Sequence, residues 1–229
     1  MKKNTRKLKK AALLLCSAVL LVCISIGATV AYLTSTATVT NTFTVGNVKI
    51  TLDEEDVDGS TSDAARDTAN NYHIFPDGQY KKDPIVHVDR TSENCYLFVK
   101  VENGLADIEA AATISVGDEA KQQTIAQQMA ANGWVALDGV ANVYYYTENN
   151  SAATANAGKD LPVFSAFKIS NAVVGGEKPD EVDASDTKLY LGDYAGAKIT
   201  VTAYAVQADG FGTAKDAWDA TFGKPDETV

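Results

Sequence analysis

Hydrophobic residues occur in this 229-residue chain as one long run near the start and as many short segments after it. The run extends from Ala11 to about Ala31, and the ten residues before it carry six Lys or Arg and no acid. A basic start, an apolar core and small residues at its end predict an export signal peptide over residues 1–31. Because Thr29 and Ala31 are small, we expect cleavage between Ala31 and Tyr32.

The same run is 21 residues long, which is enough to span a bilayer. A retained membrane anchor is therefore the alternative to cleavage. No cluster of Lys and Arg follows the run, and this favours cleavage. We expect contact with the membrane only through the uncleaved signal segment.

Beyond the signal, hydrophobic and polar residues alternate from Thr36 to Leu52. The apolar positions share one parity before Gly46 and the other parity after it, namely Ala37, Val39, Phe43 and Val45, then Val48, Ile50 and Leu52. A period of two residues predicts a strand, and the shift at a glycine predicts a bulge or bend. The acidic stretch that follows, up to Asn71, is expected to be a loop.

Short apolar segments through the rest of the chain predict further strands. They are Ile85 to Val88, Tyr96 to Val101, Ile114 to Val116, Trp134 to Leu137, Val140 to Thr147, Leu161 to Ile169, Tyr190 to Leu191 and Ala197 to Val206. Two segments have helical spacing, Asp118 to Asn132 and Thr213 to Phe222. The pattern predicts an all-β protein, a β-sandwich domain over residues 32–229 with one or two short helices in its crossovers.

The net charge of the mature chain limits the kinds of partner that it can bind. Removal of residues 1–31 leaves 14 Lys and Arg against 30 Asp and Glu, a formal charge of −16. A nucleic-acid-binding surface needs positive charge, so we expect no nucleic acid as a partner. Cys95 alone remains of the three cysteines, and an internal disulfide is therefore excluded from the mature chain. We expect Cys95 to be buried in a strand.

Metal ligands are concentrated in two places. Glu54, Asp56 and Asp58 occupy offsets of a calcium loop, but its twelfth position is Ala65 rather than Glu. His73 and His87 are the two histidines of the chain, and no His-Glu-x-x-His motif is present. We expect no cofactor, a solvated acidic loop and hydrogen-bonded histidines, with calcium at the first place or zinc at the second as the alternatives.

Some segments resemble a known family. The stretch AYLT at residues 31–34, followed by NTFTVGNVKITL at residues 41–52, resembles the specialised signal region of the TasA/camelysin family of Gram-positive bacteria. Looser similarity covers Lys82 to Val88, Cys95 to Val101, Tyr204 to Phe211 and Ala217 to Trp218. The resemblance covers the signal and about half of the mature chain.

The resemblance implies a jelly-roll-like β-sandwich that is released by a dedicated signal peptidase and secreted as a cell-surface or biofilm-matrix protein. In some members the N-terminal strand of one subunit completes the sheet of the next in a fibre. The corresponding donor positions here are Val39, Phe43, Val45, Val48 and Ile50. An exposed strand beside a free chain end fits that role, and pairing within its own domain is the alternative.

Camelysin-like proteins are also described as metallopeptidases, so a metal-dependent secreted peptidase is a second interpretation. A non-catalytic surface-binding β-sandwich is a third. Of the three, we expect the one that the resemblance implies, a secreted structural protein rather than an enzyme, with strand donation and pairing of that strand within its own domain both left open.

Overall fold

The computed structural model describes residues 47–60, 66–179 and 185–223. The predicted signal peptide, its cleavage site at Ala31 and Tyr32, and the donor positions Val39, Phe43 and Val45 lie outside these residues. No helix among the described residues is long and apolar enough to cross a bilayer.

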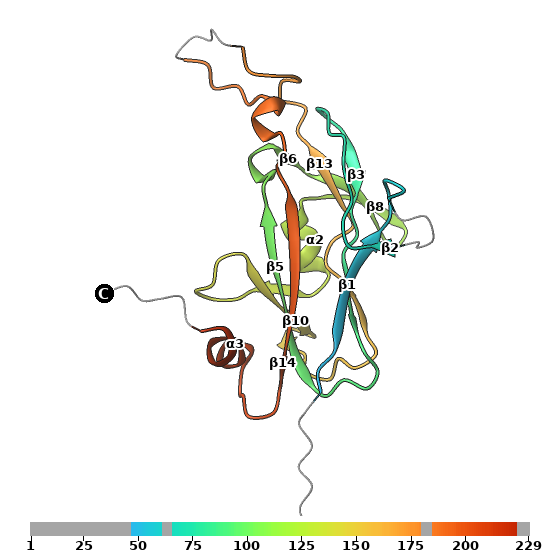
Figure 1. Ribbon diagram of the computed structural model, residues 1–229, viewed down its shortest axis with the longest axis vertical. Coiled ribbons are helices and arrows are strands. Elements are labelled where there is room, and N and C mark those ends of the chain that lie inside the picture. Colours follow the sequence, from blue (N-terminus) through green and yellow to red (C-terminus); the bar gives the residue numbers. More distant parts are fainter. Residues whose placement is uncertain (1–46, 61–65, 180–184, 224–229) are drawn as a thin grey trace, which may run out of the picture. The chain divides into compact units, whose positions relative to one another are not determined.

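The described chain is mostly β, with several antiparallel sheets and two short helices (Figure 1). Its strands are β1 (Ile50–Glu55), β2 (Arg66–Asp67), β3 (Gln79–Lys81), β4 (Ile85–Val88), β5 (Cys95–Asn103), β6 (Glu109–Ala110), β7 (Ala112–Val116), β8 (Glu119–Gln123), β9 (Trp134–Ala136), β10 (Val143–Glu148), β11 (Ser151–Ala152), β12 (Asp160–Pro162), β13 (Ala166–Ile169) and β14 (Ile199–Gln207). The helices are α2 (Ile125–Ala131) and α3 (Ala214–Phe222), and two 3₁₀ turns are η1 (Ala106–Ile108) and η2 (Leu191–Tyr194).

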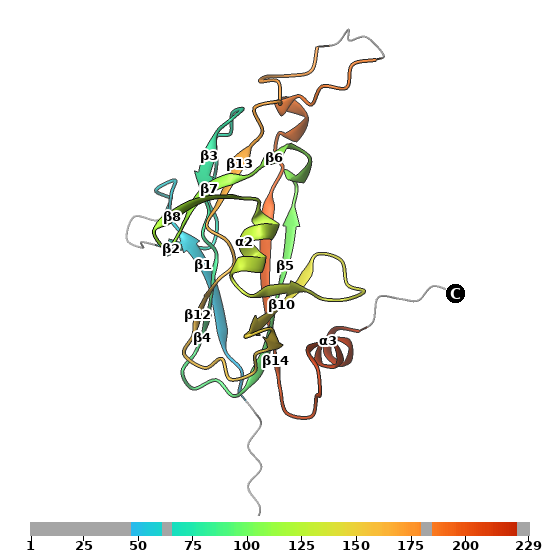
Figure 2. The ribbon, with the colours of Figure 1, turned by 180° about the vertical axis from the view of Figure 1, so that it is seen from behind.

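The largest sheet has the order β11-β10-β5-β14, with β9 paired to β10. A second sheet has the order β12-β4-β1-β2, and two smaller sheets are β3-β13-β6 and the hairpin β7-β8. In the largest sheet, β5 and β14 pair along nine residues, from Ile199 opposite Asn103 to Gln207 opposite Cys95. Figure 2 shows β5 and β14 running side by side behind α2.

Strand β5 is buried on both faces, as its nearly continuous apolar sequence predicts. Leu97 and Val99 face the larger core, where they meet Val86 of β4 and Phe167 of β13. Phe98 faces a smaller core, where its ring lies 5.1 Å from that of Trp218 in α3. Cys95 is fully buried at the start of the strand, as expected.

Several sequence predictions are confirmed. Strand β4 has the predicted bounds, and β14 lies within one or two residues of them. Strands β9 and β10 pair as predicted, with Tyr144 opposite Ala136. Helix α3 begins after Thr213, whose side chain accepts a hydrogen bond from the N–H of Asp216, as an N-cap residue does.

Four predictions are wrong. The strand expected at Tyr190 and Leu191 is instead the start of the 3₁₀ turn η2, with Tyr190 in a single bridge to Val174. The segment expected to be a loop after Leu52 continues as strand to Glu55. The helix expected from Asp118 starts at Ile125, because the chain first forms the hairpin β7-β8 around Gly117, whose φ is 62°. The strand expected from Leu161 to Ile169 is broken into β12 and β13, which pair with β4 and β3 in different sheets.

Helix α2 is attached to β13 by one buried side chain. Gln128 is 1% exposed, and its amide donates to the carbonyl of Ala166 at 2.8 Å. Its carbonyl oxygen accepts from the backbone N–H groups of Ser165 and Ala166, at 2.9 and 3.2 Å. The single side chain thus satisfies backbone groups where the chain passes from β12 into β13.

Replacement of Gln128 by Met keeps the volume of the side chain but leaves these backbone groups without partners. Each buried polar group left unsatisfied costs about 1–3 kcal/mol. We expect the Gln128→Met variant to lose at least that much free energy of unfolding in urea titration. The control is Gln122→Met on exposed β8, for which an equal loss would contradict the assigned role.

Candidate functional site

A cleft of about 830 Å³ opens between β1 and β14. Leu52, Ile199 and Val201 contribute apolar side chains from the two strands, and Leu105 and Phe167 from the larger core also line it. Polar side chains line it as well, among them Glu54, Asn70, Tyr72, His73 and Lys82. The cleft is therefore apolar along the strands and polar at the end of β1.

The two strands that border the cleft both have an unpaired edge. Among the described residues, β14 is hydrogen-bonded to β5 alone, so its other edge faces the cleft. Strand β1 pairs with β4 along Ile50 to Asp53, and β2 covers its other edge at Glu54 and Glu55 only. Unpaired strand edges carry backbone donors and acceptors that another strand can satisfy.

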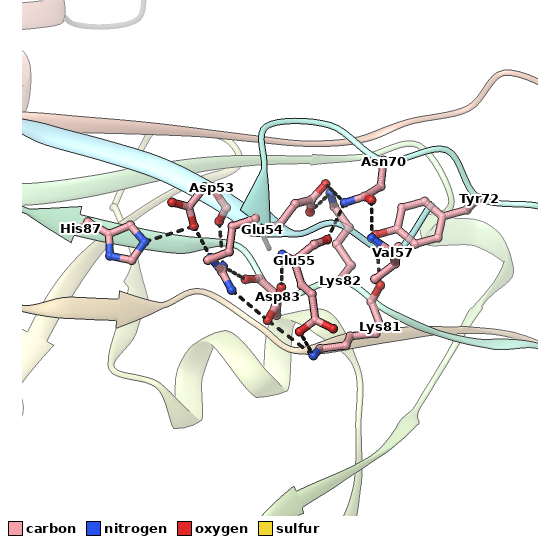
Figure 3. Close-up of polar contacts among 11 residues, drawn as sticks. Asp53, Glu54, Glu55, Val57, Asn70, Tyr72, Lys81, Lys82, Asp83 and His87 are labelled. Carbon is pink, nitrogen blue, oxygen red and sulfur yellow. Dashed lines mark hydrogen bonds and ion pairs between the residues drawn. The ribbon is translucent and has the colours of Figure 1, made fainter. Parts of the chain in front are cut away.

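The polar end of the cleft contains a cluster of charged side chains (Figure 3). It is made by the end of β1, by β2 and the residues after it, and by the stretch from the end of β3 into β4. Its members are Asp53, Glu54, Glu55, Arg66, Asn70, Lys81, Lys82, Asp83 and His87. We call these residues the charged cluster.

The most buried pair of the charged cluster is Glu54 and Lys82. The Nζ of Lys82 lies 2.5 Å from the Oε2 of Glu54, and their side chains are 11% and 6% exposed. The other carboxylate oxygen of Glu54 accepts a hydrogen bond from the amide of Asn70 at 3.1 Å. Removal of one partner of a buried ion pair leaves the charge of the other uncompensated, so the burial of each side chain depends on the presence of the other.

Arg66 connects β1 to the segment before β4. Its guanidinium donates to the carboxylate of Asp53 and, at 3.2 and 3.0 Å, to the backbone carbonyls of Asp53 and Asp83. Lys81 pairs with Glu55 at the exposed side of the cluster. Exposed pairs of this kind contribute little to stability, so the order of this region depends mainly on Arg66 and on the Glu54–Lys82 pair.

His87 lies between two carboxylates from different strands. Its Nδ1 is 2.6 Å from Asp160 of β12, and its Nε2 is 3.1 Å from Asp53 of β1. Burial lowers the pKa of His87, but the hydrogen bonds to Asp160 and Asp53 outweigh it and raise the pKa above its ordinary value. Burial likewise opposes the lowered pKa of Asp53, which the hydrogen bonds from Arg66 and His87 produce.

The residues considered for calcium are used by the loop itself or by neighbouring side chains. Asp56 accepts hydrogen bonds from the backbone N–H groups of Gly59 and Ser60, at 2.7 and 3.2 Å. Asp58 accepts from the N–H groups of Ser60 and Asn71, and these bonds lower its pKa to about 2. Glu54 points to Lys82 instead.

His73 is exposed and lines the cleft, and it does not share the contacts that His87 makes with Asp53 and Asp160. Within residues 47–60, 66–179 and 185–223, no three His, Cys, Asp or Glu side chains form a group that could hold a metal ion. The structure thus does not bring the sequence-predicted metal candidates together.

The described part of the predicted donor segment pairs within its own domain. Val48 and Ile50 pack against the larger core, and Ile50 lies opposite Val88 of β4. The backbone carbonyls of Asn47 and Lys49 accept hydrogen bonds from Glu93 and Asp89. The chain is therefore held to the turn between β4 and β5 as far back as residue 47.

Asn70, Arg66 and Lys82 were missed as functional candidates. The run Lys81-Lys82-Asp83 directly before a strand was a signal, because basic residues beside a strand can neutralise acids of a neighbouring one. Nothing local marked Asn70, which meets Glu54 across 16 residues of sequence.

The raised pKa of His87 gives stability a defined pH dependence. The stabilisation is complete below the unfolded-state pKa of about 6.5 and is lost as the pH rises through the folded-state value. We expect His87→Gln to lower the free energy of unfolding by up to about 1 kcal/mol more near pH 5.5 than near pH 8.5, after allowance for solvent screening. Urea titrations at both values measure this, with exposed His73→Gln as the control. An equal loss at both pH values would contradict it.

No family model, no curated protein and no solved structure matches this chain. A functional assignment therefore depends on the residues and contacts described above.

Proposed function

We propose that the chain is a secreted structural protein of the cell surface or biofilm matrix, and that its copies associate by strand addition. In this proposal residues 36–45 of one copy enter the cleft between β1 and β14 of another. The domain is then a β-sandwich of jelly-roll type, completed by the incoming strand.

The observation that carries the proposal is the pair of unpaired strand edges on the two sides of one cleft. An added strand along the open edge of β14 would satisfy the backbone groups of that edge. Strand addition derives its affinity from these main-chain hydrogen bonds and its specificity from pockets for alternate side chains. Leu52, Ile199 and Val201 offer apolar contacts for such side chains.

The sequence offers a strand of suitable length and pattern. Apolar residues recur at Ala37, Val39, Phe43 and Val45, mostly every second position. Ten residues in extended conformation span about 33 Å, comparable with the nine residues of β14.

The attachment of residues 47–49 argues for donation to another copy. Asn47 and Lys49 are held beside the β4–β5 turn, in line with β1. A return into the chain's own cleft would therefore require a reversal within the few residues before Asn47. A second copy can supply the same segment without any reversal.

Negative charge supports an assembly that depends on conditions. A formal charge of −16 after loss of the signal keeps copies apart at low ionic strength. Salt screens this repulsion over about 10 Å at 0.1 M, so assembly should increase with ionic strength.

We test the proposal with the secreted chain and its Val201→Lys variant. A lysine at Val201 places a charge in the apolar part of the cleft, where an incoming strand would have to desolvate it. We expect the unchanged chain to form fibres or oligomers in electron microscopy and sedimentation, and the variant to remain monomeric. Thr113→Lys, on the exposed face of β7, adds the same charge as the control and should assemble normally.

Because Val201 also contacts the core, a second measurement avoids the Val201→Lys substitution. A labelled peptide of residues 36–45 should bind a shortened variant that lacks residues 32–45, and unlabelled peptide should displace the labelled one. If that variant still forms fibres, or if the peptide does not bind, strand donation is wrong. A chain that stays monomeric and binds no peptide would fit the non-catalytic surface-binding interpretation instead.

A further inference from the structure

We propose that Lys82 and Asn70 become joined by an isopeptide bond, and that the chain forms this bond itself with Glu54 as the catalytic carboxyl group. The bond would connect Nζ of Lys82 to Cγ of Asn70 at the polar end of the cleft. It would link the residues after β2 to the segment before β4.

The carboxylate of Glu54 brings the two reacting groups together (Figure 3). Its Oε2 lies 2.5 Å from Nζ of Lys82, and its Oε1 lies 3.1 Å from Nδ2 of Asn70. Because both groups contact one carboxylate, the amine and the amide are held within a few ångströms of each other. Such proximity replaces a collision between two free groups, and it is a large part of what an intramolecular reaction needs.

The surroundings of the pair favour a nucleophilic amine. The side chains of Lys82 and Glu54 are 11% and 6% exposed, and Nζ of Lys82 lies 6.0 Å from the ring centre of Tyr72. Low exposure keeps most water away from the pair, so little solvent competes for the amine. The neutral amine of Lys82 is the form that can attack a carbonyl carbon.

The amide of Asn70 is also polarised. Its Oδ1 accepts a hydrogen bond from the backbone N–H of Val57 at 2.7 Å. During attack the negative charge develops on this oxygen, and a fixed N–H donor at that point stabilises it. Its Nδ2 meanwhile faces Glu54, which is where a proton must be delivered for ammonia to leave.

The reaction balances without an oxidant or a co-reactant. Lys82 gives one proton to Glu54, and its nitrogen lone pair forms a bond to Cγ of Asn70. Glu54 passes that proton to Nδ2 as the bond between Cγ and Nδ2 breaks, and ammonia leaves. The nitrogen of the new amide gives its remaining extra proton to the ammonia through Glu54, so one protonated amine and one primary amide yield one secondary amide and one ammonium ion.

The neighbouring residues provide a natural comparison. Lys81 pairs with Glu55, but their side chains are 50% and 44% exposed. The amide of Asn71 donates to Asp58 at 3.1 Å, in an exposed part of the loop. At Lys82 and Glu54, by contrast, low exposure coincides with a carboxylate that also contacts the amide of Asn70.

Mass spectrometry of the purified full chain tests the proposal directly. Trypsin should release residues 67–81 and 82–90 as one branched peptide, uncut after Lys82. Its mass should be about 17 Da below the sum of the two peptides, because one ammonia is lost. If the two segments are recovered as separate peptides, with cleavage after Lys82, the proposal is wrong. Loss of ammonia from Asn70 without branching would equally overturn it.

Variants then test the assigned roles. Glu54→Gln, Asn70→Ala and Lys82→Arg should each abolish the branched peptide. Glu55→Gln, Asn71→Ala and Lys81→Arg are the matched controls and should retain it. Circular dichroism checks that each variant is folded, and a folded Glu54→Gln variant that still forms the branched peptide would refute the catalytic role of Glu54.

Discussion

The nine-residue antiparallel pairing of β5 with β14 is the interaction on which the rest of the structure depends. It supplies hydrogen-bond partners to the backbone of β5. The side chains of β5 are buried on both faces, so water cannot supply those partners instead. The larger core can then form against Leu97 and Val99, and the smaller core against Phe98. Because β14 is the last strand of its sheet, the same pairing also places an open edge beside β1.

The charged cluster neutralises the acidic end of β1, which lies beside this open edge. The end of β1 carries Asp53, Glu54 and Glu55, three acids that would repel one another beside an apolar cleft. Arg66, Lys82 and Lys81 each neutralise one of them from a neighbouring segment. The strand is thereby kept in the sheet up to Glu55, and the polar end of the cleft acquires a fixed arrangement of groups.

The sequence predicted those elements whose signals are local. Strand β4, strand β5 and helix α3 follow from short apolar runs and from the capping Thr213. The sequence could not predict that β1 continues through its acids, because Lys82 lies 28 residues away from Glu54. Strand β8 falls within the predicted helix because Glu119 to Gln123 is almost entirely polar, and its pairing with β7 has no local pattern.

For the candidate site, the sequence identified His73 and Glu54 but not how they are arranged around the cleft. Asn70, Lys82 and the free edge of β14 are brought together by pairing between distant segments. Periodicity along the chain describes which face of a strand is buried, but not which edge is left without a neighbour. The function proposed here depends on that edge.

The attachment of Asn47 and Lys49 to the β4–β5 turn also has a mechanical consequence. A pull on the chain at residue 47 acts along the axis of β1, whereas the hydrogen bonds that join β1 to β4 lie across that axis. These bonds are then loaded in shear and must fail together, rather than opening one after another from an end. The start of β1 is therefore held against a pull along its axis by several hydrogen bonds at once.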